Sequence, residues 1–487
     1  MSQPYKGPLE QIDDCRWRIP RSYKEGMRVD GVIYADSKLM ESVKADQSPE
    51  QVANVACLPG IVGASLAMPD IHWGYGFCIG GVAATDPEQG GVVSPGGVGY
   101  DINCGVRMVR TNLPAKRVEK RIDTLVEALF RNVPCGVGRG GAIKFSPDEL
   151  TRLMREGVPY VIQKRGLGWD SDIEVTEAGG CLPDARPDLL SKRAVQRGHD
   201  QCGTLGSGNH FLEIQVVDRV DDAHAASVFG LEEGQVVVMI HSGSRGLGYQ
   251  VCDDAIRDLR DAPRKYGIAL PDKQLVCAPV ESAEGQKYLG TMRAAANFAW
   301  CNRQVLTHLA RETLSDVFDT PPEQLGMNVI YDVAHNIAKM ETYEIDGTNR
   351  MLCVHRKGAT RAFPPGHPEL PQRYRPIGQP VIVPGDMGRH SYLLVGTEAA
   401  VSETFGSACH GAGRLMSRSA AIRAAKGRSI RKELEQRGVI ARARGRHGLD
   451  EEQPDAYKDV NNVVDVLHNA GISRRVVRMK PLGVIKG

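Results

Sequence analysis

The stretch Val236–Ile240 (VVVMI) runs directly into His241–Gly246 (HSGSRG), so an apolar segment with strand character ends in a glycine-rich turn that begins with histidine. Residues Val329–Val333 lead in the same way to Ala334, His335 and Asn336. A buried strand holds the residue that follows it in a defined place, and glycine lets the backbone approach a ligand closely. The pattern predicts a site built from strand ends.

Three further segments repeat this arrangement. They are LGSGN before His210, SAC before His410, and GGVGY before the pair Asp101 and Cys104. One such histidine is most often a hydrogen-bonded core or turn residue. Several in the same context favour a metal and phosphate site assembled from distant parts of the chain.

The composition is that of a soluble globular protein, with 41% apolar residues, 25% charged residues and a net charge of +2 over 487 residues. A net charge this small does not give the protein a positively charged surface on all sides, so any site for a polyanion must be a local patch. The twelve cysteines form no CxxC pair, which argues against a zinc finger. With no apolar signal core and no apolar run of about 18 residues, we expect a cytoplasmic protein that does not contact a membrane.

The order of segments predicts one elaborate α+β domain spanning residues 1–487, because neither a Ser/Gly linker nor an internal repeat divides it. Residues 66–110 are strand-like, and 327–396 suggest a mixed sheet. We expect an exposed irregular loop over 166–200. Helices are expected over 115–132, 147–165, 413–438 and Ser282–Glu312, with Ser282 as N-cap.

Five residues offer metal ligands of different types: Asp101, Cys104, His210, His241 and His335. Carboxylate oxygen suits Mn²⁺ or Mg²⁺, whereas thiolate and imidazole suit Zn²⁺ or Fe²⁺. Five ligands are too many for one tetrahedral zinc ion, but they would suit two ions that share Cys104. Two neighbouring ions are typical of phosphoryl-transfer sites.

His410 differs from these residues because Gly411, Ala412 and Gly413 follow it, which we interpret as the opening of a helix. Free N–H groups at a helix start bind anions, and a neutral imidazole there could act as a nucleophile toward phosphate. A helix cap or a further metal ligand remains the alternative. Asp70 could orient a metal-bound histidine, and His72 could lie behind the ligands or face the substrate.

Two basic clusters, 356–361 and 442–446, could hold RNA phosphates, although solvated loops are the commoner explanation. A glycine turn over 384–391 follows an apolar run and could present backbone N–H groups to phosphate. Each of these signals is weak when it is taken alone.

In combination, the motifs YDINCGVR (100–107), GTLGSGNHFLE (203–213), HSGSRG (241–246), DVAHN (332–336) and CHGAGR (409–414) resemble the RtcB family of RNA ligases. The resemblance runs nearly from end to end. It implies a single large domain with mixed sheets around a central metal and nucleotide site. It also implies a GTP- and Mn²⁺-dependent enzyme that joins RNA 2′,3′-cyclic phosphate or 3′-phosphate ends to 5′-hydroxyl ends.

In the family pattern, His410 becomes guanylylated and passes GMP to the RNA 3′-phosphate. Asp101 and His210 would hold one Mn²⁺, His241 and His335 the other, and Cys104 would bridge them. Contacts to GTP would fall on Asn209, His210, Phe211, Leu212, Glu213, His335, Asn336, Pro384, Gly385, Asp386, Met387, Ser391, His410, Gly411, Ala412, Gly413, Tyr457 and Lys486.

The expected partners are GTP, broken or spliced RNA such as tRNA halves, and an activating protein of the archease type. The chain departs from the pattern at Asp386, where some members have serine, and at Arg389 and His390. A carboxylate beside nucleotide phosphate would repel it unless Arg389 or a metal ion compensates.

Two other functions stay open from the residues alone. A dinuclear phosphodiesterase or phosphatase could use His410 as a general acid, but it would need no nucleotide pocket reaching to Lys486. An RNA-binding protein with a structural metal would leave the five ligands unexplained, and the sequence shows no aromatic stacking ladder to favour it.

Overall fold

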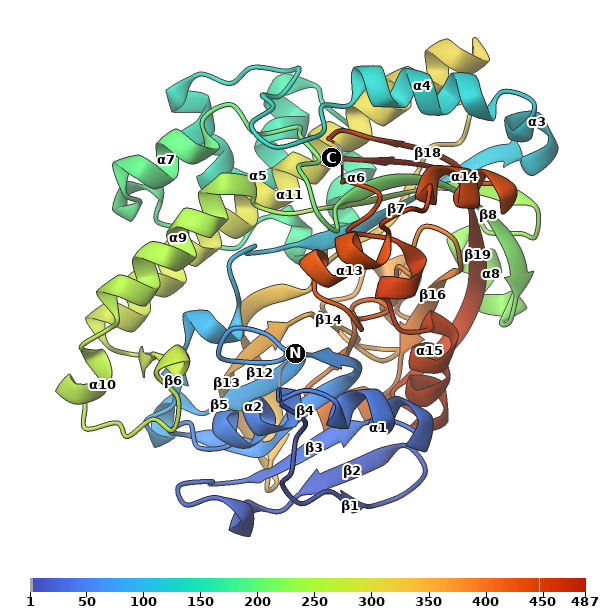
Figure 1. Cartoon of the computed structure of the whole chain (residues 1–487). Coiled ribbons are helices and arrows are strands. Elements are labelled where there is room, and N and C mark those ends of the chain that lie inside the picture. The colour runs from blue at the N-terminus through green and yellow to red at the C-terminus, as the bar shows by residue number, and fades with distance from the viewer. Residues whose placement is uncertain (1–2, 446) are drawn as a thin grey trace.

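Two large sheets carry most strands of the protein, which we describe from a computed structural model over residues 3–445 and 447–487 (Figure 1). The first sheet has the order β1 (Glu10–Gln11), β2 (Arg16–Ile19), β3 (Asp30–Tyr34), β4 (Ile61–His72), β5 (Ile79–Thr85), β13 (Thr348–Lys357) and β12 (Asn336–Ile345). Its strands pair antiparallel except β3 and β4, which are parallel. Helices α1 (Ser37–Lys44) and α2 (Ser48–Val55) lie beside it.

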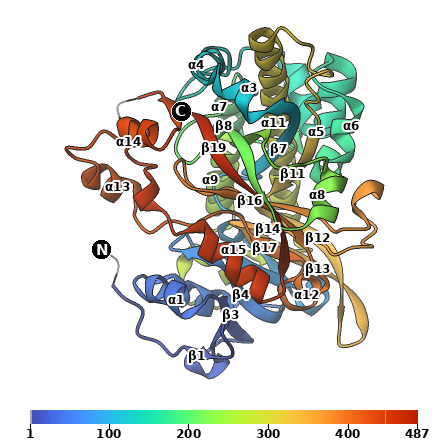
Figure 2. The ribbon, with the colours of Figure 1, turned by 90° about the vertical axis from the view of Figure 1, so that its right-hand side faces the viewer.

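The second sheet has the order β11 (Val329–Ala334), β7 (Gly105–Pro114), β9 (Gln235–Ser242), β8 (Phe211–Val220), β19 (Ser473–Lys486), β16 (Ser391–Gly396) and β15 (Pro380–Val383). The strand β18 (Ile440–Ala443) runs parallel to β19. Figure 2 shows β8 and β19 side by side in this sheet. Two short ribbons pair β6 (Val92–Val93) with β10 (Ala278–Pro279), and β14 (Ala359–Arg361) with β17 (Ser407–Cys409).

The predicted mixed sheet over 327–396 is in fact divided between the two large sheets. β11, β15 and β16 belong to the second, whereas β12 and β13 belong to the first. The chain crosses from one sheet to the other at His335, the single residue between β11 and β12. The α+β class is confirmed, and this crossing places a predicted site residue where the sheets meet.

The long helix α11 (Ala283–Phe318) confirms the strongest helix prediction, and the Ser282 side chain caps it by accepting a hydrogen bond from Gly285 N. It continues six residues beyond the predicted end at Glu312. Figure 1 shows α4 (Ile122–Asn132), α5 (Pro147–Arg165) and α9 (Arg245–Asp258) along it. The other helices are α3 (Ala115–Glu119), α6 (Asp170–Glu174), α7 (Lys192–Gly198), α8 (Ala223–Phe229), α10 (Ala262–Lys265), α12 (Glu398–Thr404), α13 (Arg418–Ala424), α14 (Ile430–Gln436) and α15 (Val460–Asn469).

Two predictions, about the segments 166–200 and 413–438, were wrong. Residues 166–200 are not a plain loop, since they form α6 and α7 and bury Asp172 against Arg311. The segment 413–438 is helical only in α13 and α14.

The cluster 356–361 is neither a solvated loop nor an RNA patch. Arg356 is buried, with its two terminal guanidinium nitrogens each 2.7 Å from an oxygen of the Glu341 carboxylate, and Arg361 is buried beside Glu369. In the second basic cluster, Arg442 pairs with Glu127, whereas Arg446 lies outside the described residues. Within the described ranges, no helix combines the length and apolarity that a bilayer span requires.

Candidate active site

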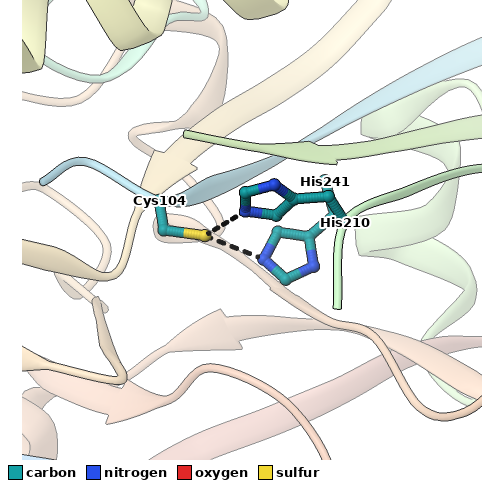
Figure 3. Close-up of side chains that lie close together, drawn as sticks. All are labelled: Cys104, His210 and His241. Carbon is teal, nitrogen blue, oxygen red and sulfur yellow. Dashed lines mark hydrogen bonds between the residues drawn. The ribbon is translucent and has the colours of Figure 1, made fainter. Parts of the chain in front are cut away.

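Three predicted ligands converge where the strands of the second sheet end. His241 lies in β9 opposite Val106 of β7 and opposite Phe211 of β8, so it is flanked by Cys104, which precedes β7, and His210, which precedes β8. The Cys104 Sγ atom lies 3.3 Å from His210 Nε2 and 3.2 Å from His241 Nε2 (Figure 3). The donor atoms of these three residues all lie within 4.8 Å of one another.

Asp101 and His335 extend this group at its two ends. The Asp101 carboxylate lies 2.9 Å from His210 Nε2, and His335 Nε2 lies 3.3 Å from His241 Nε2. The spatial order is therefore Asp101, His210, Cys104, His241, His335, with the thiol in the middle. The structure brings together all five residues that the sequence selected as ligands.

The electrostatics of this donor group fit divalent metal ions. Burial lowers the pKa of His241 and His335 well below the ordinary value, so both imidazoles are neutral and present lone pairs. Burial also raises the pKa of the Cys104 thiol, and a bound cation would offset this by stabilising the thiolate. Among the described residues, the Nδ1 atoms of His241 and His335 have no hydrogen-bond partner. A mixed oxygen, sulfur and nitrogen set suits Mn²⁺, Zn²⁺ or Fe²⁺.

Arg303 on α11 contacts three segments that carry predicted metal ligands. The sequence alone did not indicate this residue. Its Nη1 donates to Asn103 O and Ser242 O, both at 2.8 Å, next to Cys104 and His241. Its Nη2 lies 2.7 Å from Asp332, three residues before His335, and neither side chain of this ion pair is exposed. Nothing around residue 303 in the sequence signals this role, because every partner is distant in the chain.

Replacing Arg303 with methionine should destabilise the protein by about 3 kcal/mol, because it leaves buried carbonyls and part of the Asp332 charge without a partner. The free energy of unfolding from urea titration checks this. Arg293→Met is the matched control on the same helix, since its partner Asp184 is 82% exposed and 4.0 Å away. Equal losses in both variants would contradict the proposed role of Arg303.

His410 follows β17 and is held by Asp70 of β4. One carboxylate oxygen of Asp70 accepts from His410 Nδ1 at 2.5 Å, from His410 N at 3.0 Å and from Gly411 N at 3.3 Å. With the Nδ1 proton donated to Asp70, the lone pair of the neutral ring is on Nε2. The His410 ring centroid lies 4.8 Å from that of His335, so the histidine stands directly beside the metal-donor group.

The prediction that His410 opens a helix was wrong. The next helix, α13, begins at Arg418, and the N–H groups of His410 and Gly411 point at Asp70. The glycine-rich sequence suggested a helix start, but in the structure this turn surrounds the buried carboxylate of Asp70. Asp70 thus orients His410 rather than a metal ligand.

The Asp70 segment is itself anchored by Lys458. The buried Nζ of Lys458 donates to Ile71 O at 2.6 Å and to Pro69 O at 3.2 Å, on either side of Asp70. His72, at the end of the same strand, lines the cavity described next.

One cavity contains most of the predicted site. The predicted residues that line it are Asp101, Cys104, Asn209, Phe211, Glu213, His241, His335, Asn336, Pro384, Gly385, Asp386, Met387, His410, Gly411, Ala412, Gly413, Tyr457 and Lys486. His210 does not line the cavity; it contacts Asp101 and Cys104 within the metal-donor group. Leu212 is in the core, because alternation along β8 turns it away from the face of Phe211 and Glu213. Ser391 is buried too, and its Oγ accepts from Gly385 N at 3.1 Å, which holds the turn.

The departure at Asp386 is compensated within the chain. Arg389 Nε lies 2.8 Å from the Asp386 carboxylate, and Gly388 N donates to its other oxygen at 2.9 Å. The Asp386 carboxylate therefore has an ion-pair partner inside the turn, while its burial raises its pKa. A compensating positive charge of this kind is needed if nucleotide phosphate is to bind near the turn.

Further polar residues of the site were not selected from the sequence. Arg414, Arg418 and Glu452 also line the cavity. Glu452 is buried, lies 3.0 Å from Arg414 and accepts a hydrogen bond from the Tyr457 hydroxyl. Arg245 Nη1 lies 2.8 Å from His210 Nδ1. Glu452 belongs to an ordinary acidic stretch, so no local signal could have found it.

The family model described as tRNA-splicing ligase RtcB matches residues 51–487. The chain belongs to the RtcB family. Among relatives named tRNA-splicing ligase RtcB, that of Thermococcus kodakarensis is 54% identical over 480 residues, which is 99% of each chain. That of Archaeoglobus fulgidus is 54% identical over 482 residues, 99% of each chain, and that of Methanococcus maripaludis 52% identical over 482 residues, 99% of this chain and 100% of its own. The resemblance inferred from the RtcB motifs is confirmed.

Proposed function

We propose that this protein is a GTP- and Mn²⁺-dependent RNA ligase that joins 2′,3′-cyclic phosphate or 3′-phosphate ends to 5′-hydroxyl ends. Spliced tRNA halves and broken RNA are its expected substrates, as the names of its relatives suggest. One observation carries the proposal. Asp70 holds His410 through Nδ1 and leaves Nε2 available beside five converging metal donors.

The chemistry follows from a neutral, oriented imidazole. His410 Nε2 attacks the α-phosphorus of GTP, a P–N bond forms, and pyrophosphate leaves. The RNA 3′-phosphate oxygen then takes GMP from the histidine, which activates the 3′ end. The 5′-hydroxyl attacks the RNA phosphorus, the new phosphodiester forms and GMP leaves. A cyclic phosphate must first be opened to a 3′-phosphate by water.

Asp101 and His210 would hold one divalent ion, His241 and His335 the second, and Cys104 would be shared by both. When bound, the ions neutralise the crowded phosphates of GTP and RNA. The buried, neutral imidazoles and the central thiol support this division. Mn²⁺ is the ion expected from the family.

The cavity also has groups that fit a guanine base. Glu213 and Lys486 line it together with Phe211 and Tyr457, whose rings can cover a base. An ionised carboxylate can accept from both N1–H and the 2-amino group of guanine. Adenine has neither an N1–H nor a 2-amino group, so Glu213 would select GTP over ATP.

Changing Glu213 to glutamine should remove the pH dependence of GTP binding as well as the preference for GTP. Burial raises the pKa of Glu213 to about 7, so the carboxylate is mostly protonated at pH 6 and mostly ionised at pH 8. GTP affinity should therefore rise roughly tenfold across this range in the parent protein and stay flatter in the variant. Calorimetry in the His410→Ala background, which cannot trap GMP covalently, measures this. Parallel pH profiles would exclude Glu213 as the titrating group.

Incubation of the pure protein with GTP labelled at the α-phosphate and Mn²⁺ tests the proposed function. We expect an acid-labile, base-stable adduct that transfers its label to RNA ending in a 3′-phosphate. Release of phosphate from RNA ends without any adduct would instead support the dinuclear hydrolase. A parallel reaction with an archease-type protein tests whether an activator is needed.

A further inference from the structure

Three tyrosines from distant segments form a stack on the protein surface. Tyr75 lies between β4 and β5, Tyr100 precedes β7, and Tyr249 lies on α9. The rings of Tyr100 and Tyr249 are stacked, with centroids 4.8 Å apart and planes 25° apart. Tyr75 meets Tyr100 edge-on at 5.6 Å. We call these three residues the tyrosine stack.

The tyrosine stack is accessible and has a cation beside it. Tyr249 is 45% exposed, and Tyr75 and Tyr100 are half-buried. The guanidinium of Arg197, an exposed residue of α7, lies 4.8 Å from the Tyr249 ring centroid. Tyr100 and Arg197 both pack against the Tyr249 ring, and the exposed part of this ring and the guanidinium plane are open to a ligand that stacks.

The position of the stack connects it to the metal-donor group. Tyr100 directly precedes Asp101 in the chain. Tyr249 lies four residues after Arg245, the first residue of α9, and Arg245 contacts His210. The stack therefore extends outward from the Asp101 and His210 end of the donor group.

The charge around the stack favours a nucleic acid. Lys192 and Arg193 are exposed on α7 together with Arg197. Of the nearby acidic residues, Asp253 and Asp254 of α9 are paired with Arg257, and Asp272 adds a negative charge near Tyr75. Exposed rings interleaved with cations are the arrangement by which proteins hold single strands, because every base has a face that can stack.

We propose that the tyrosine stack and Arg197 form a platform that holds an unpaired base of the RNA substrate close to the ends being joined. This inference rests on the proposed ligase function for its substrate. The base could come from the strand with the 3′-phosphate or from the strand with the 5′-hydroxyl. Because stacking needs no base-specific hydrogen bond, the platform would tolerate any of the four bases.

The first test compares Tyr249→Ala with Tyr249→Phe. Alanine should weaken binding of single-stranded RNA about tenfold, whereas phenylalanine should bind like the parent protein, because the ring and not the hydroxyl does the stacking. Fluorescence anisotropy with 3′-phosphate and 5′-hydroxyl oligonucleotides gives both affinities. Met351→Ala, at another exposed apolar side chain, is the matched control.

The second test places a single abasic nucleotide at each position near either end. In the parent protein one position in one strand should lose affinity, and in Tyr249→Ala that position should no longer matter. Labelling of the protein by GTP should be the same in both. Equal abasic profiles in the two proteins, with labelling intact, would overturn the platform and leave the ligase function standing. Absent labelling with an abasic effect that disappears in Tyr249→Ala would overturn the ligase function instead.

Discussion

Alanine in place of His410 should abolish covalent labelling of the protein by GTP, a loss of at least about 10³-fold in the first step. Nε2 of His410 is the proposed nucleophile, because Asp70 takes Nδ1 and the three histidines of the metal-donor group face one another or Cys104. The variant should still bind metal, since its side chain lies outside the donor group. Radiolabelled GMP on the washed protein and bound Mn²⁺ are the two measurements.

Two variants make this test selective. Asp70→Asn keeps the nucleophile but replaces the carboxylate that accepts its Nδ1 proton, so it should slow labelling strongly without abolishing it. His468→Ala, a histidine away from the cavity, should label like the parent protein. GMP that stays covalently attached to His410→Ala would show that another residue is the nucleophile.

The strand-end histidines could be predicted from the sequence because each carries its signal in adjacent residues. An apolar run leads directly to the donor residue at His241 and at His335, with a glycine turn after His241, and the sheet then brings the two runs together in register. Glu213 and Leu212 show the limit of such reasoning. Both belong to one motif, but strand alternation sends one side chain to the cavity and the other to the core.

The residues that were missed act through partners far along the chain. Arg303 is one polar residue in a long buried helix, and its importance depends on carbonyls near residues 103 and 242. The tyrosine stack joins positions 75, 100 and 249, so no ladder is visible in the sequence itself. Arg356 was misread for the same reason, since its partner Glu341 pairs with it only after β12 and β13 have formed.

Cys104→Ala should remove metal binding almost completely and lower both protein labelling and RNA joining by at least about 10³-fold. The Cys104 thiol lies between His210 and His241, the two histidines assigned to different ions. A thiolate shared by two ions would bind both and reduce the repulsion between their charges, so its loss should affect both positions at once. Direct metal analysis after dialysis against Mn²⁺ measures the number of ions that stay bound.

The amount of Mn²⁺ bound by different variants shows whether both ions share the thiol of Cys104. Asp101→Ala and His335→Ala, at opposite ends of the donor group, should each weaken one ion and leave the other, so that about half the bound Mn²⁺ remains. Cys353→Ala, at a buried cysteine of β13 outside the site, should retain all of it. If Cys104→Ala also retained about half, the thiol would serve only one ion. The pair of ions would then have to be bridged by the bound phosphates instead, and metal content would depend on GTP.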